Sequence, residues 1–149
     1  FERFYFDKND PNTLSDNIVW AITKSTSKKN KLWIGTAHGL TVLNTESIDF
    51  SRIAIPNPDN LQFGYGTGSV IEESFDGENI LWINSYAGLL RYDVTRKRFD
   101  RFLSDKNNAY SLTSNQVNNI LKDRSGVLWA ATDNGLNFFS QKNLSLIHI

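Results

Sequence analysis

The sequence repeats itself three times along its length. Three Leu-Trp pairs lie 49 and 47 residues apart, and each is followed, six residues after the tryptophan, by a Gly-Leu pair. The pairs are Leu32-Trp33 with Gly39-Leu40, Leu81-Trp82 with Gly88-Leu89, and Leu128-Trp129 with Gly135-Leu136. Units of this length are small supersecondary structures that bury their apolar faces by stacking on their neighbours. We therefore expect one partial domain over residues 1–149, built from repeat units at about 1–49, 50–98 and 99–149.

Each unit is expected to form four short antiparallel strands. An inner strand, at 18–24, 69–74 and 117–122, leads through a polar turn into the strand that carries the Leu-Trp pair. The recurring glycine permits the positive φ of a tight turn into a third strand, and a segment of the Phe-x-Arg-Phe type forms the fourth. Both faces of the Leu-Trp strand are apolar, so each sheet needs a neighbouring sheet on either side.

These features predict an all-β fold made of β-propeller blades. Propellers typically arrange four to eight four-stranded blades around a channel. Three four-stranded antiparallel blades, plus one leading strand at Phe1 to Phe4, would form an arc of a larger propeller. Such an arc leaves an apolar blade face at each end, and we therefore expect self-association, as a dimer or an edge-to-edge assembly.

The composition excludes several functional classes. Sixteen Lys and Arg balance sixteen Asp and Glu, so the chain lacks the basic surface that nucleic acids require. The absence of Cys excludes disulfides, thiol catalysis and Cys-ligated zinc. No apolar run approaches the roughly 18 residues that span a bilayer, so contact with a membrane is expected only through other parts of a parent protein. A chain that begins at Phe1 and has no Met is expected to be a piece of that longer protein.

Metal and acid–base chemistry find little support in the sequence. The loop at 7–12 resembles a calcium loop, but Pro11 and Asn12 interrupt it and Ile18 stands where a bidentate Glu is needed. Glu72 and Glu73 are adjacent on a strand and should point to opposite faces, so they cannot form a catalytic pair with each other. We expect no metal, no cofactor and no catalytic residue, although acids converging from different blades leave a propeller hydrolase as an alternative.

Candidate binding residues are those that differ between repeats. The recurring tryptophans are expected to be core residues, because inter-blade packing requires the same side chain on every blade. Variable positions on the hairpin tips, the inner strands and the crossing segment instead combine aromatic faces with planar polar groups, as neutral carbohydrate requires. The candidates are Trp20, His38, Tyr65, Tyr86, Asn118 and Asp133.

The repeat resembles a known family. Leu-Trp-Ile-Gly-Thr-x-x-Gly-Leu at 32–40, with Leu-Ser-Asp-Asn-x-Val at 14–19, is similar to the two-component regulator propeller repeat. The second unit departs from it, since Asn84 stands in the place of Gly35 and a Pro- and Gly-rich segment occupies 56–68. The resemblance implies the sensor region of a Bacteroidetes hybrid two-component histidine kinase, on the periplasmic side of the inner membrane, with oligosaccharides as ligands.

Three functions remain open from the sequence. The first is a ligand-sensing fragment that regulates carbohydrate utilisation, with the kinase domain outside these residues. The second is an architectural or dimerisation propeller without a ligand site of its own. The third is a hydrolase of the glycoside or ester type.

Overall fold

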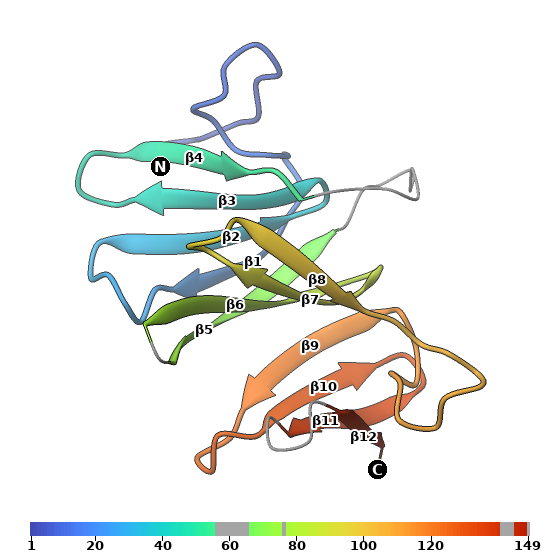
Figure 1. Cartoon of the computed structure of the whole chain (residues 1–149). Coiled ribbons are helices and arrows are strands. Elements are labelled where there is room, and N and C mark those ends of the chain that lie inside the picture. Colours follow the sequence, from blue (N-terminus) through green and yellow to red (C-terminus); the bar gives the residue numbers. More distant parts are fainter. Residues whose placement is uncertain (56–65, 76, 141–144, 149) are drawn as a thin grey trace.

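The computed structural model describes residues 1–55, 66–75, 77–140 and 145–148, and this part of the chain is all-β. Its strands form three four-stranded sheets, here called blades 1, 2 and 3 (Figure 1). Blade 1 contains β1 (Val19–Lys24), β2 (Lys31–Thr36), β3 (Gly39–Asn44) and β4 (Asp49–Ile53). Blade 2 contains β5 (Thr67–Phe75), β6 (Glu78–Ser85), β7 (Gly88–Asp93) and β8 (Arg98–Phe102). Blade 3 contains β9 (Val117–Lys122), β10 (Leu128–Thr132), β11 (Gly135–Ser140) and β12 (Ser145–His148).

Each blade is an antiparallel meander whose strands pair in sequence order. The turn between its second and third strands is the predicted glycine turn, with φ of 123° at Gly39, 109° at Gly88 and 116° at Gly135. A hydroxyl closes each of these turns by donating a hydrogen bond to the glycine carbonyl, at 2.7 to 3.0 Å. The donors are Thr36, Ser85 and Thr132, which occupy the same position in the three repeats.

The blades are wedged face to face with their inner strands side by side. Strand β5 contacts β1 and β2 of blade 1, and β9 contacts β5 and β6 of blade 2 (Figure 1). The predicted arc of propeller blades is therefore confirmed.

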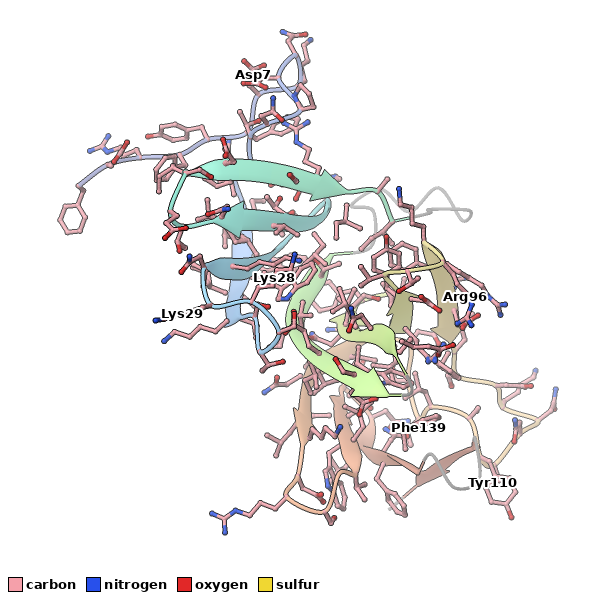
Figure 2. The ribbon with its side chains drawn as sticks, turned by 60° about the vertical axis from the view of Figure 1, so that its left-hand side comes forward. Asp7, Lys28, Lys29, Arg96, Tyr110 and Phe139 are labelled. Atoms are coloured by element: carbon pink, nitrogen blue, oxygen red, sulfur yellow. The ribbon has the colours of Figure 1, made fainter. Side chains whose placement is uncertain are left out.

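Most of the apolar core lies in the two seams between blades, and a smaller cluster of Leu14, Ile34 and Phe50 packs on blade 1. Trp33 and Trp82 each point from their own blade toward the next one and are 2% exposed. Phe139 reaches into the second seam from blade 3, and its ring centroid lies 4.9 Å from that of Trp82 (Figure 2). Trp129 occupies the same place on blade 3 but is only half-buried, because none of the described sheets covers that face. Core placement of the tryptophans is thus confirmed for the first two and holds in part for the third.

The leading segment corrects the sequence-based expectation. Phe1 to Phe4 form no strand, because no third strand of a preceding blade lies beside them. The segment is held to blade 1 by side chains instead. The ring of Phe4 lies 5.2 Å from that of Phe50, and the backbone N–H of Phe6 donates to Asn17 at 2.7 Å.

Within these described ranges, no helix has the length and apolar character needed to cross a membrane.

Candidate functional site: a pocket where the three inner strands begin

Each inner strand is irregular near its start. The pairing register shifts between Val19 and Ala21 in β1 and between Thr67 and Val70 in β5. In β9 the shift lies between Val117 and Asn119, which pair with the adjacent residues Thr132 and Ala131 of β10. Irregularities of this kind break the strict alternation of side chains and can turn a residue away from the sheet face that its position predicts. They therefore place the first residues of all three inner strands around a common hollow.

The hollow is a pocket of about 270 Å³ at the meeting point of the three blades. Its polar and aromatic lining comes from Trp20 of blade 1, from Ser69, Asn84 and Tyr86 of blade 2, and from Asn118 of blade 3. None of its described lining residues is an Asp, Glu, Lys or Arg. The volume is slightly below that of drug-sized ligand sites, so one small ring or the end of a longer molecule would fill it.

An aromatic pair from two blades stands at the pocket. The rings of Trp20 and Tyr86 meet edge to face, with centroids 4.8 Å apart, and are 41% and 50% exposed. Gly66 makes room for the indole, because a Cβ at that position would lie 1.9 Å from the Trp20 ring. Such a pair offers apolar faces to a ligand at the rim.

A buried amide forms part of the pocket wall. Asn84 on β6 is 5% exposed, and its Nδ2 donates to the backbone carbonyl oxygens of Val117 and Asn118 at 3.1 and 3.2 Å. Among the described residues, its Oδ1 has no hydrogen-bond partner. A buried acceptor without a partner is rare in folded proteins and calls for an explanation.

The structure brings together three of the six predicted site residues, namely Trp20, Tyr86 and Asn118. His38 and Asp133 lie on the hairpin tips of blades 1 and 3 and are not among the residues that line this pocket. There His38 Nδ1 is 2.7 Å from Asp16 Oδ2 on the surface. A ligand role for these two residues stays a prediction. Tyr65 lies outside the described residues.

Asn84 is not among the residues that the sequence predicts for the site. The sequence did mark its position, since the first unit has Gly35 there and the pairing register places Ala131 at the same point of blade 3. A polar side chain at a buried position that is otherwise Gly or Ala is the signal that could have identified it.

The acidic residues beside the seams have structural partners. Glu72 turns toward blade 1 and Glu73 toward blade 3, so their predicted opposite orientation is confirmed. Partial burial would raise the pKa of Glu72, but hydrogen bonds from Thr26, Trp33, Ser25 and Ser27 outweigh it and lower that pKa to about 2. Glu73 accepts a hydrogen bond from Trp82 Nε1 at 2.9 Å and pairs with Lys122.

A third tryptophan has the same kind of partner. Trp129 Nε1 donates to Asp123 at 2.8 Å. Hydrogen bonds from Ser125 and then from Trp129 lower the pKa of Asp123 to about 2. The three acids therefore hold indole nitrogens in place, and Glu72 and Asp123 are ionised at neutral pH.

A comparison with known protein families gives a match in blade 3. Residues 111–134 match the model of the two component regulator propeller. The matched segment of this propeller repeat contains β9 and β10, and with them the blade 3 side of the pocket. It confirms the resemblance that the sequence indicates.

Solved structures share this fold. The extracellular domain of the hybrid two component system BT3049 from B. thetaiotaomicron superposes with a TM-score of 0.72 at 23% identity, over 97% of this chain. That of the system BT4673 from the same organism superposes with a TM-score of 0.71 at 22% identity, over 93% of this chain. At these identities the likeness shows the fold, and the chain spans only 18% and 17% of those two proteins. No curated protein matches the chain.

Metal ligation is not supported by the described side chains: among them, no three His, Cys, Asp or Glu residues are grouped so that they could hold an ion.

Proposed function

We propose that the chain is a ligand-sensing part of the extracytoplasmic region of a hybrid two-component receptor. Its fold is that of extracellular domains of such systems, and its third unit matches their propeller repeat. These matches support a non-catalytic role, with the kinase in another part of the parent protein. We place the chain on the periplasmic side of the inner membrane.

The observation that carries the ligand-binding part of the proposal is the pocket shared by three blades, whose described lining residues carry no charge. Its aromatic pair can stack on the apolar face of a sugar ring, and its amides and hydroxyl can bond to sugar hydroxyls. The ligand class that this combination favours is a glycan-derived oligosaccharide, whose detection would regulate carbohydrate utilisation.

A ligand in this pocket would contact residues of all three blades at once. Trp20 belongs to blade 1, Tyr86 to blade 2 and Asn118 to blade 3, so a bound molecule links all three. A ligand shifts a receptor between two arrangements by binding one of them more tightly. We propose that binding favours one relative placement of the blades, which the parent receptor transmits to its kinase.

Calorimetric titration of the full receptor ectodomain with oligosaccharides tests the proposal. We expect one oligosaccharide class to bind and Tyr86→Ala to weaken its binding at least tenfold. Tyr110→Ala is the matched control, because Tyr110 is a comparably exposed tyrosine on the loop between β8 and β9 (Figure 2). Absence of binding by every oligosaccharide, together with activation of the receptor by another class of molecule, would refute the glycan part.

One observation favours a second, architectural role. Leu40 and Leu89 are fully buried by the next blade, whereas the equivalent Leu136 is 41% exposed on blade 3. The outer blade faces are therefore built for contact with further protein. If this role is the sole one, Tyr86→Ala leaves signalling in cells unchanged, whereas a charge at Leu136 disrupts it.

A further inference from the structure

We infer that the open face of blade 3 is the docking surface for a further blade of the parent receptor, and that this blade presents a Lys or Arg side chain to Asp123. The open face is the one that carries Trp129 and that none of the described sheets covers. The inference rests on the proposed place of the chain in a larger ectodomain, and it does not depend on the ligand.

Each tryptophan of the repeat is held by one acid, but the acid comes from two different places. An indole N–H only donates a hydrogen bond, so it needs an acceptor. In blade 1 the acceptor comes from the following blade, whereas in blades 2 and 3 it comes from the tryptophan's own blade. The pairs are Trp33 with Glu72 at 2.6 Å, Trp82 with Glu73 at 2.9 Å and Trp129 with Asp123 at 2.8 Å.

The register of the inner strands shows which of these positions are equivalent. The residue that pairs with the leucine of the Leu-Trp pair is Lys24 in blade 1, Glu72 in blade 2 and Lys122 in blade 3. The next residue in the sequence is Ser25, Glu73 or Asp123. Glu72 and Lys122 both reach the preceding blade, whereas Glu73 faces the following one. At each seam, a residue of the second set therefore meets a residue of the first set from the next blade.

Each seam inside the described part of the chain combines one acid with a different kind of partner. Between blades 1 and 2, the hydroxyl of Ser25 donates to Glu72 at 2.8 Å. Between blades 2 and 3, Glu73 forms an ion pair with Lys122. Two carboxylates at one tryptophan would repel each other in a partly desolvated place. A blade that supplies its own acid thus meets a cation from the next blade, and a blade that supplies a hydroxyl meets an acid.

Blade 3 has the acid of the second arrangement without the cation. Asp123 stands at the position of Glu73, holds Trp129 and is ionised at neutral pH. None of the described Lys, Arg or His side chains forms an ion pair with it. A blade that covers this face should therefore bring a cation at the position of Lys122, because Asp123 would repel an acid there.

The apolar part of the open face has the same design as the seam between blades 2 and 3. It contains a hollow of about 320 Å³ beside Leu121, Trp129 and Leu136. Leu121 and Leu136 are 63% and 41% exposed, whereas Leu89, the equivalent of Leu136 in blade 2, is fully buried against blade 3. The open face thus offers the apolar and the charged contacts with which blade 2 receives blade 3.

The occupant that this surface fits is a blade of the same repeat. Blades bury their apolar faces on their neighbours. The chain spans only 18% and 17% of the two similar extracellular domains, so an ectodomain of that size has further chain to supply such a blade. Blade 1 of a second copy presents a cation at the equivalent position, Lys24, and is the competing occupant in the test.

The first experiment tests the pairing of acid and cation inside the chain. Lys122→Glu places a second acid at Trp82, Glu73→Ser removes the first one, and the double variant reproduces the arrangement between blades 1 and 2. We expect each single variant to lower the urea midpoint of the 149-residue chain, and the double variant to have a midpoint above both. Lys106→Glu, on the exposed loop between β8 and β9, is the control and should leave the midpoint unchanged. A double variant whose midpoint is not above both would overturn the inference.

The second experiment identifies the occupant in the full receptor ectodomain. A crystal structure should show a Lys or Arg side chain from a further blade of the same chain beside Asp123. Three results would each overturn the inference: an acid or an uncharged residue at that place, blade 1 of a second copy, or an open face in solvent. Because this structure is of the wild-type protein, it serves as the test even if a variant does not fold.

A charge exchange at the docking surface tests the contact in solution. Replacing the covering cation with Glu should lower the melting temperature of the ectodomain at least twofold more in the wild type than in Asp123→Asn, because only the wild type then has two facing acids. Equal losses in the two backgrounds would overturn the inference. An ectodomain that shows the unequal losses but binds no oligosaccharide would refute the glycan part of the proposed function and leave the docking surface in place.

Discussion

Glu72 of blade 2 accepts a hydrogen bond from the indole nitrogen of Trp33 in blade 1, with 2.6 Å between Oε1 and Nε1. The same carboxylate accepts hydrogen bonds from the turn between β1 and β2, including the hydroxyl of Thr26 at 2.8 Å and the backbone N–H of Ser27 at 3.0 Å. One side chain of the second blade thus closes a turn of the first and orients its core tryptophan. These hydrogen bonds therefore join blades 1 and 2 in addition to the apolar packing between them.

Replacing Glu72 with Gln is expected to destabilise the chain by about 1–2 kcal/mol at pH 7, because a neutral amide accepts these hydrogen bonds less strongly and part of the group is exposed. The folded pKa of about 2 lies below the ordinary value of 4.5. The ionised carboxylate therefore contributes stability above about pH 4.5, and this contribution is lost as the pH falls toward 2. Urea unfolding between pH 2 and 7 measures it. We expect the difference in unfolding free energy between wild type and Glu72→Gln to shrink as the pH falls from about 4.5 toward 2.

Glu46→Gln is the control for this experiment, because Glu46 is an exposed residue of the turn between β3 and β4. An equal pH dependence of the Glu72 and Glu46 variants would contradict a stabilising role for Glu72.

Trp82 and Trp129 are expected to contribute differently to the free energy of unfolding. Trp82→Ala should cost about 3–5 kcal/mol, since the ring is 2% exposed and packs against Phe102 and Phe139. Trp129→Ala should cost the 149-residue chain clearly less, about 1–2 kcal/mol, because its face is uncovered. Chemical denaturation of both variants measures the difference. Equal losses would contradict the conclusion that a tryptophan in a seam contributes more stability than one on the uncovered face of blade 3.

Two glycines with positive φ allow the cost of a left-handed backbone to be measured separately from the cost of a steric clash. Gly88 has φ 109° and a Cβ there would lie 2.4 Å from the carbonyl oxygen of Phe102, whereas Gly126 has φ 86° with nothing closer than 3.9 Å. Gly126→Ala should therefore cost about 1–2 kcal/mol from the left-handed backbone alone. Gly88→Ala should cost more, because Cβ also displaces the neighbouring strand. Thermal unfolding of the pair gives the comparison, and a smaller loss at Gly88 would count against this reading.

A side chain at Gly66 should disturb the pocket while leaving the seams intact. In Gly66→Ala the new Cβ would displace the Trp20 ring, which is half-exposed and free to move toward solvent. We expect at least a tenfold loss of affinity for an oligosaccharide that binds the wild-type ectodomain in calorimetric titration, with little change in melting temperature. In a Trp20→Ala background the same substitution should add nothing. An additional loss there would mean that Gly66 acts independently of Trp20.

The self-association expected from the sequence stays a prediction, and the structure shows which residues to change. Ile22 is 66% exposed at one end of the arc, and Leu121 and Leu136 are 63% and 41% exposed at the other. Sedimentation of the 149-residue chain should give a mass above 17.0 kDa, and Leu121→Lys combined with Leu136→Lys should lower the association. Tyr110→Lys, on an exposed loop, should not. A monomer at all concentrations would refute the prediction.

Much of the fold within each blade could be predicted from the sequence repeat. The blade strands, the glycine turns, the hydroxyls that close them and the opposed faces of Glu72 and Glu73 all follow from contacts between residues close in sequence or from the alternation along one strand. Such features depend on short-range backbone geometry, which each repeat carries within itself.

The leading segment and the pocket could not be predicted in this way. Whether Phe1 to Phe4 form a strand depends on a partner strand outside their own repeat, and pairing energy exists only when that partner is beside them. Trp20, Tyr86 and Asn118 meet because the inner strands are irregular at their starts and because the blades are inclined to one another. The unpartnered oxygen of Asn84 likewise arises only where β6 and β9 approach. The sequence alone determined the blades, since their periodicity is local. The angle between the blades depends on the packing of whole sheets, and it decided which residues share a pocket.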